Sequence, residues 1–186
     1  MNLPNKLTLL RILLVPVFCV FLCMEEWAAQ LIAVLIFILA SLTDLLDGYI
    51  ARRDNLITDF GKLVDPIADK LLITSGMIFM VAQGRMSAAV VLIFVAREFI
   101  VSAFRMLAAS RGTVIAADKL GKYKTFMQTL AIILLIILKP VGNSWALLGN
   151  AGMITADVVT WIALALSILS CADYIWKNRF IIDSQL

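Results

Sequence analysis

The sequence predicts an all-α integral membrane protein with six transmembrane helices. Of its 186 residues 62% are hydrophobic, whereas soluble domains contain roughly 45–50% apolar residues. The mean hydropathy is +0.99. The apolar residues form about six runs, each close to the roughly 20 residues that a helix needs to cross a bilayer. This length leaves no room for a second domain, so we expect residues 1–186 to form a single helical membrane domain.

The first span is expected over about residues 7–24, after a short lead-in at the membrane interface. Pro16 lies within this run and should kink or weaken the helix, because proline cannot donate a backbone hydrogen bond. The run lacks a convincing small-residue cleavage site. We therefore expect it to stay in the fold and not to be removed as a signal peptide.

Three polar residues form a stripe along this otherwise apolar helix. Asn5, Thr8 and Arg11 recur at a spacing of three residues, which places them on one helix face. The side chain of Arg11 could extend to the interface or turn inward to a phosphate. The stripe favours the inward orientation.

The second and third spans are joined by a polar loop. Trp27 is an expected interfacial anchor at the start of the second span, which ends near Arg52. The loop covers residues 53–59, and the third span then continues to about Gln83. Pro66 implies that this third helix either begins beside it or is kinked there.

The fourth span, over about residues 86–109, carries charges in its middle. Glu98, Ser102 and Arg105 are spaced at i, i+4 and i+7, so they share a face that we expect to point into a cavity. The alternative, weighed for Glu98 and for Arg105, is an internal ion pair that only fixes helix packing.

The densest basic region follows the fourth span and contains Arg111, Lys119, Lys122 and Lys124. It has neither the glycine spacing nor the preceding strand of a nucleotide P-loop. Such a region either attracts anionic lipids or recruits a phosphorylated substrate, and the two roles are compatible. The fifth span is expected over about residues 125–138. The sixth begins at about Asp157, as an acid at a helix N-terminus, and ends near Asp173.

The composition excludes several kinds of chemistry. The chain has no histidine, so any proton transfer depends on a carboxylate, a lysine, a tyrosine or water. Its three cysteines lie in apolar runs and are expected to be packing residues. The formal net charge is only +3, and we expect no nucleic-acid partner.

Two neighbouring segments carry four aspartates. The first places two acids and two small residues on one helix face: Asp44, Asp47, Gly48 and Ala51. The second repeats the pattern at one-turn spacing with Gly61, Asp65 and Asp69. An acid near the bilayer centre costs about 2.5–3.5 kcal/mol on insertion scales, and such acids usually face a cavity or a pathway. Ordinary solvated charges at helix ends are the less favoured alternative.

The aspartates converge if the two helices lie side by side, and their mutual repulsion then requires cations between them. Carboxylate oxygens suit Mg²⁺ or Mn²⁺, and an all-aspartate cluster suits two ions. Gly48 and Ala51 would let a bulky ligand approach the backbone, and Arg52 offers a forked cation for a phosphate. We therefore expect a polar, metal-binding cavity at the inner end of the bundle.

These residues fill a known signature. The chain resembles the CDP-alcohol phosphotransferases, whose motif is D-x-x-D-G-x-x-A-R, eight further residues and G-x-x-x-D-x-x-x-D; every fixed position is filled between Asp44 and Asp69. The lead-in from Pro4 to Thr8 is also similar to the family's N-terminal segment. The resemblance implies a six-helix fold, commonly a homodimer, that transfers a CMP-linked phosphatidyl or similar group to an alcohol and releases CMP.

The resemblance also implies roles for individual residues. Asp69 would be the catalytic base and, with three further aspartates, a metal ligand: Asp44, Asp47, Asp65 and Asp69. The donor nucleotide would be held by Asn5, Thr8, Asp47, Gly48, Ala51, Arg52 and Gly61.

Two further segments indicate which acceptor alcohol is used. Residues 96–105 and 119–125 resemble the phosphatidylglycerophosphate synthase branch of the family, whose donor is CDP-diacylglycerol and whose acceptor is sn-glycerol-3-phosphate. A glycine is common in that branch where this chain has Ala103. We expect the acceptor phosphate to be bound by Arg105, Arg111 and Lys122. The roles of four further residues stay open: Arg97, Glu98, Lys119 and Lys124.

Other functions remain possible at this stage. Cardiolipin synthase and phosphatidylinositol-phosphate synthase would share the donor site and differ in the acceptor. A divalent-cation transporter could use the same acids, but it would move metal without releasing CMP and would leave the spacing of Gly48, Ala51 and Arg52 unexplained.

The basic residues predict the orientation in the cell membrane. Six spans leave only Arg85 and Lys139 in outer turns, whereas the other loops are rich in lysine and arginine. The positive-inside rule therefore predicts that both termini and the active site are cytoplasmic.

Overall fold

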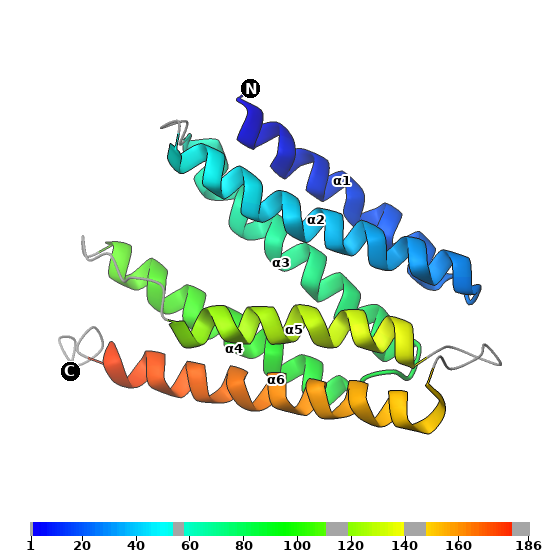
Figure 1. Cartoon of the computed structure of the whole chain (residues 1–186). Helices are drawn as coiled ribbons and strands as arrows, with labels where there is room; N and C mark the ends of the chain where they lie inside the picture. The colour runs from blue at the N-terminus through cyan, green and yellow to red at the C-terminus, as the bar shows by residue number, and fades with distance from the viewer. Residues whose placement is uncertain (1, 54–57, 111–118, 140–147, 180–186) are drawn as a thin grey trace.

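The computed structural model confirms the all-α prediction. It describes residues 2–53, 58–110, 119–139 and 148–179, and within these ranges it contains six helices and no strand. The helices are α1 (Leu3–Cys23), α2 (Trp27–Arg53), α3 (Asp59–Ala82), α4 (Ala88–Ser110), α5 (Lys119–Leu138) and α6 (Gly149–Lys177). Successive helices run in opposite directions, so that α1 begins and α6 ends towards the same end of the bundle (Figure 1).

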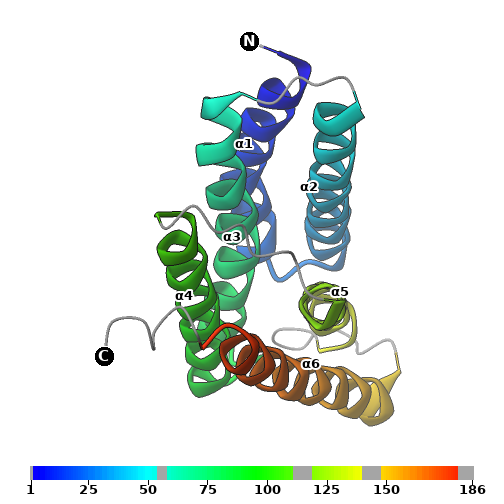
Figure 2. The same ribbon diagram turned by 90° about the vertical axis from the view of Figure 1, so that its left-hand side faces the viewer.

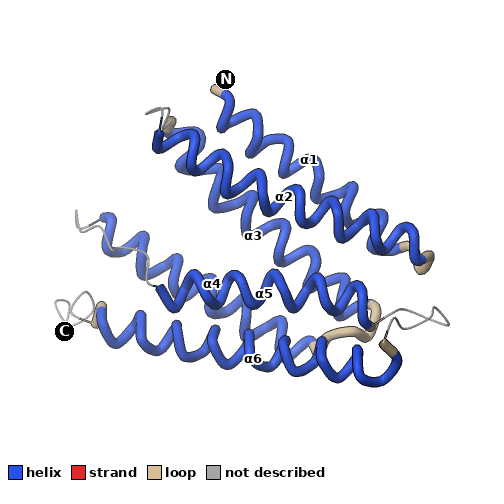
Figure 3. The backbone as a smooth tube through the Cα atoms, in the orientation of Figure 1, coloured by secondary structure: helices blue, strands red, loops and turns tan. Residues whose placement is uncertain are grey.

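The six helices form two groups of three. Helices α1, α2 and α3 pack together, and α6 packs on both α4 and α5 (Figure 2). The groups meet where α2 and α3 contact α5 and where α3 contacts α4. Phe18 and Phe37 lie in the apolar core with their ring centroids 5.4 Å apart. The turns after α1 and after α3 are short (Figure 3).

Four of the helices are long and apolar enough to cross a membrane by length and composition: α1, α2, α5 and α6. Helices α3 and α4 are of comparable length, but each has three charged residues within its apolar stretch: Asp65, Asp69 and Lys70 in α3, and Arg97, Glu98 and Arg105 in α4. Several of these side chains make polar contacts inside the bundle, which is consistent with the same membrane bundle.

Two predicted helix starts are wrong. Helix α5 begins at Lys119 and not near residue 125, and α6 begins at Gly149 and not at Asp157. The apolar run marks the part of a helix that can lie in lipid, whereas backbone hydrogen bonding continues into polar turns beyond it. Asp157 is therefore no N-terminal acid; its carboxylate accepts a hydrogen bond from Lys139 at 2.9 Å.

Both internal prolines lie within continuous helices. Helix α1 includes Pro16, and α3 begins at Asp59 and passes through Pro66, so the alternative that α3 begins beside Pro66 is wrong. The expected lead-in is itself helical from Leu3, with Pro4 in the first turn, where its missing N–H has no intrahelical acceptor to lose.

The turn between α3 and α4 is anchored by Arg85, which is only 2% exposed. Its Nη2 donates to Gln30 Oε1 at 2.9 Å, and Gln30 and Gln83 both donate to the carbonyl of Leu22. Burial lowers the pKa of Arg85 to about 10. Arg85 is thus part of a hydrogen-bond network that joins the end of α1, the start of α2 and the end of α3.

Candidate functional site

The polar stripe of α1 points into the bundle, as predicted. Asn5, Thr8 and Arg11 are all buried, and the side chain of Arg11 is fully inaccessible. Arg11 Nη1 lies 2.6 Å from Asp44 Oδ1, and its Nε donates to the carbonyl of Ala40 at 3.2 Å. Arg11 therefore turns inward and pairs with the first aspartate of the motif.

Thr8 orients a second aspartate. Its hydroxyl lies 2.5 Å from Asp65 Oδ1 and 3.1 Å from the carbonyl of Pro4. A threonine hydroxyl has one hydrogen to donate, and the shorter contact is the one to the charged acceptor. Asp65 of α3 is thus held by Thr8 of α1, which lies 57 positions earlier in the chain.

Gly61 allows the starts of α1 and α3 to approach closely. The Thr58 hydroxyl donates to Asn5 Oδ1 and accepts from the Gly61 amide, both at 3.0 Å, which caps α3. A Cβ at Gly61 would lie 3.2 Å from both Asn5 Oδ1 and Thr58 Oγ1, and 3.6 Å from Asp65 Oδ2. The motif glycine therefore leaves space for the oxygen atoms of its neighbours.

The structure brings part of the predicted aspartate cluster into one region. Asp69 interacts electrostatically with Asp44 and Arg11. The side chains of four motif residues lie outside the described part of the chain: Asp47, Gly48, Ala51 and Arg52. Among the described residues no group of three or more acidic, cysteine or histidine side chains is arranged to hold a metal. The four-aspartate metal centre therefore remains a prediction.

The described residues nevertheless fit a divalent cation in their chemistry. Asp44, Asp65 and Asp69 offer carboxylate oxygens, the donors that Mg²⁺ and Mn²⁺ prefer. Thr8 contacts Oδ1 of Asp65, and a Cβ at Gly61 would lie 3.6 Å from Oδ2. A carboxylate that a hydrogen bond orients is a suitable metal ligand.

Helix α4 holds a second polar cluster near Asp69. Glu98 Oε1 accepts from Arg97 Nη1 at 3.0 Å and contacts Lys124 Nζ of α5. Both Glu98 and Lys124 interact electrostatically with Asp69. One turn further along α4, Ser102 Oγ accepts from Lys70 Nζ at 2.5 Å. The expectation that Glu98, Ser102 and Arg105 share an inward face holds for Glu98 and Ser102 but is wrong for Arg105, which is exposed.

The cations predicted to bind the acceptor phosphate are not found in this polar cluster of the described residues. Arg105 is exposed, and its guanidinium stacks over Tyr174 of α6 at 5.9 Å from the ring centroid. Lys122 is exposed on α5, and Arg111 lies outside the described residues. The sequence argument missed the buried Lys124, although Gln128 at i+4 is also buried and marks the same inward face of α5.

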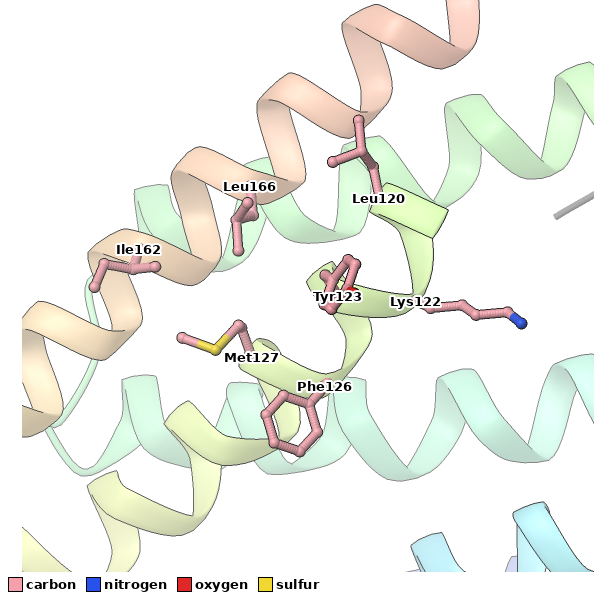
Figure 4. Close-up of a pocket in the computed structure, with 7 residues that line it drawn as sticks. All are labelled: Leu120, Lys122, Tyr123, Phe126, Met127, Ile162 and Leu166. Atoms are coloured by element: carbon pink, nitrogen blue, oxygen red, sulfur yellow. The ribbon is translucent and has the colours of Figure 1, made fainter. Parts of the chain in front are cut away.

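A groove of about 690 Å³ lies between α5 and α6 on another face (Figure 4). It is lined by Leu120, Lys122, Tyr123, Phe126, Met127, Ile162 and Leu166. The Lys122 ammonium extends away from the apolar side chains. None of the motif aspartates in the described part of the chain lines this groove.

A family model for CDP-alcohol phosphatidyltransferases matches residues 1–169. The chain belongs to the CDP-alcohol phosphatidyltransferase family. This assignment agrees with the resemblance of the motif and covers α1 to α5 and most of α6.

Curated relatives of this family align over nearly the whole chain. A Bacillus subtilis protein named CDP-diacylglycerol–glycerol-3-phosphate 3-phosphatidyltransferase is 37% identical over 95% of both chains. A Rickettsia felis protein of the same name is 39% identical over 93% of both chains. A probable phosphatidylglycerophosphate synthase of Mycobacterium tuberculosis is 38% identical over 94% of this chain and 80% of its own length.

Proposed function

We propose that this protein transfers the phosphatidyl group of CDP-diacylglycerol to sn-glycerol-3-phosphate, giving phosphatidylglycerophosphate and CMP. The observation that carries the proposal is the similarity, at 37–39% identity over at least 93% of the chain, to enzymes named for this reaction. The polar contacts that Thr8, Arg11 and Glu98 make inside the bundle support it. Polar and charged side chains are costly within a membrane, and those that occur there usually serve a function.

The proposed site holds two divalent ions, Mg²⁺ or Mn²⁺, through Asp44, Asp47, Asp65 and Asp69. When bound, such ions neutralise pyrophosphate charge and stabilise the departing CMP. Thr8 keeps the Asp65 carboxylate oriented, and Arg11 limits the negative charge around Asp44. We assign the nucleotide end of the donor to Asn5, Thr8, Asp47, Gly48, Ala51, Arg52 and Gly61, as the motif implies.

Asp69 acts as the base in this proposal. The acceptor hydroxyl oxygen forms a bond to the phosphorus that carries the diacylglycerol group, and the bond from that phosphorus to the CMP oxygen breaks. The hydroxyl proton passes to the Asp69 carboxylate. Because the chain has no histidine, a carboxylate of the motif is the proposed proton acceptor.

The acceptor phosphate needs cations within reach of Asp69. Arg105, Arg111 and Lys122 remain the residues proposed from the sequence. Lys124 and Arg97 join them, since both contact Glu98, and Lys124 interacts electrostatically with Asp69. We further propose a homodimer with the active site on the cytoplasmic side, in line with the family resemblance and the charge distribution.

Replacing the base tests the proposal directly. Asp69→Asn keeps the shape of the side chain but cannot accept the proton as a carboxylate does, so we expect CMP release from CDP-diacylglycerol and glycerol-3-phosphate to fall by roughly 10²–10⁴-fold. Metal-dependent donor binding should largely persist. Asp157→Asn, which removes an acid near the outer end of α6, is the matched control and should retain activity.

Three results would contradict the proposal. Near wild-type turnover of Asp69→Asn at saturating metal would show that another group takes the proton. Transfer by the wild-type protein to phosphatidylglycerol or inositol phosphate in preference to glycerol-3-phosphate would instead identify a different acceptor, and metal flux without CMP release would identify a transporter.

A further inference from the structure

We propose that Glu98 is a positioning residue for the acceptor phosphate, because its carboxylate holds the side chains of Arg97 and Lys124 together beside Asp69. This inference rests on the proposed function and assigns a role within that same site. The alternative, considered from the sequence, is an ion pair that only fixes the packing of α4 on its neighbours.

The contacts centre on a single oxygen atom. Arg97 Nη1 donates to Glu98 Oε1 at 3.0 Å, and Lys124 Nζ reaches the same oxygen from α5. Lys124 is only 2% exposed, whereas the Glu98 side chain is 28% exposed. One partly accessible carboxylate therefore fixes the place of a cation that is otherwise enclosed by protein.

Further tethers hold this arrangement from the neighbouring helices. Arg97 Nη2 donates to Ser170 Oγ of α6 at 3.0 Å. Ser102 Oγ donates to the backbone carbonyl of Glu98 at 2.6 Å and accepts from Lys70 of α3. Side chains from α3, α5 and α6 thus converge on one turn of α4.

The charges explain why a carboxylate stands at this position. Two cations that share one contact point repel each other, and burial removes much of the hydration of Lys124. Glu98 offsets both effects and leaves a net charge of +1 over the three side chains, which suits a phosphate. Without Glu98, Lys124 and Arg97 lose the oxygen atom that they share, and no other contact in the described part of the bundle holds the two cations together.

A purely structural ion pair and a positioning residue predict different kinetics. A packing defect disturbs donor and acceptor sites together, because both depend on the same bundle. Misplaced cations disturb only a ligand that carries a phosphate at that point. A structural ion pair therefore predicts that KM rises for both substrates, whereas a positioning residue predicts that KM rises for glycerol-3-phosphate alone.

The first test is Glu98→Gln, which keeps the size of the side chain and removes its charge. We expect KM for glycerol-3-phosphate to rise about tenfold or more, as for the loss of a charge-assisted hydrogen bond, while KM for CDP-diacylglycerol changes less than about twofold. Glu98→Asp should recover part of the acceptor affinity. Asp157→Asn, which breaks the Lys139 pair at the other end of the bundle, should change neither KM.

Inorganic phosphate provides an independent probe of the same cations. As a competitor of glycerol-3-phosphate, it should inhibit Glu98→Gln more weakly than the wild type, in proportion to the rise in KM. Ser170→Ala, which releases only Arg97, should give a smaller rise in the same direction and serves as the readout if Glu98→Gln does not fold.

The inference is overturned if both KM values rise together, if Glu98→Gln leaves KM for glycerol-3-phosphate unchanged, or if Ser170→Ala and phosphate inhibition show no acceptor-specific effect. In each of these cases the wild-type protein still makes phosphatidylglycerophosphate. A wild type that releases no CMP with glycerol-3-phosphate would instead refute the proposed function, and the role of Glu98 with it.

Discussion

At the scale of single residues, Thr8 of α1 orients a carboxylate of α3, that of Asp65. Its contact with Asp65 at 2.5 Å joins two residues that are far apart in sequence. We expect Thr8→Val, which keeps the shape of the side chain, to lower kcat/KM for CDP-diacylglycerol by about 10–100-fold. Asp65 is a proposed metal ligand, and loss of a hydrogen-bond partner of a metal ligand typically has this effect.

The control for Thr8→Val is Thr155→Val. Thr155 also bonds a carbonyl four residues earlier, that of Ala151, but it is exposed on α6 and has no carboxylate partner among the described residues. Equal activity losses in both variants, measured as CMP release, would mean that only the hydroxyl's backbone contact matters.

Some residue positions could be predicted from the sequence and others could not. Spacing along α1 predicted the shared face of Asn5, Thr8 and Arg11, because a helix fixes side-chain direction within a few residues. The partners of Lys70 and Lys124 depend on how α3, α4 and α5 pack, and no local pattern encodes that packing. Arg105 has the right spacing, but its described contact is with Tyr174.

At the scale of elements, α3 contacts α1 and α5 at a position that requires a small residue, Gly76. A Cβ at Gly76 would lie 3.4 Å from Phe18 and 3.7 Å from Ile132, which is ordinary contact. We expect Gly76→Ala to be tolerated and Gly76→Leu to destabilise the protein by about 1–3 kcal/mol, because extra methylene groups overfill a packed core. Thermal unfolding in detergent measures both.

Ala96→Leu on α4 is the matched control for Gly76→Leu. Ala96 is exposed, so the larger side chain has space outside the bundle. A Gly76→Leu variant as stable as Ala96→Leu would show that α3 can move away from Phe18 without loss.

The helices themselves were predictable, while their ends were less so. Six apolar runs gave the number and order of helices, because each run must satisfy its backbone hydrogen bonds internally in lipid. The first turns of α5 and α6 lie before the runs that were used for the prediction. Hydropathy shows which residues can lie in lipid, but it does not show where the backbone hydrogen bonds of a helix begin.

At the scale of the whole molecule, the alternation of six helices places the turns at two opposite ends. Arg53, Lys122 and Arg179 belong to one end, and Lys139 belongs to the other. The positive-inside rule therefore predicts that the first end, with the start of α1 and the end of α6, is cytoplasmic. The orientation itself is not fixed by the fold, since an inverted bundle would make the same internal contacts.

Cysteine labelling at the two ends of α4 tests this orientation. Ser87 precedes α4 and Ser110 ends it, both are exposed, and either serine can become cysteine with little change in size. Arg85 is unsuitable as an outer reporter because it is buried. In a background without Cys19, Cys23 and Cys171, a membrane-impermeant thiol reagent added to intact cells should label Ser87→Cys.

Ser110→Cys should react with the same reagent only after the membrane is opened. Helix α4 is long enough to separate the two positions by about 33 Å, at about 1.5 Å per residue, which exceeds the roughly 30 Å hydrocarbon core. Labelling of Ser110→Cys in intact cells, with Ser87→Cys protected, would invert the bundle. It would place the Glu98 cluster and the aspartates on the side away from cytoplasmic nucleotides, and the proposed reaction would then lack access to its donor.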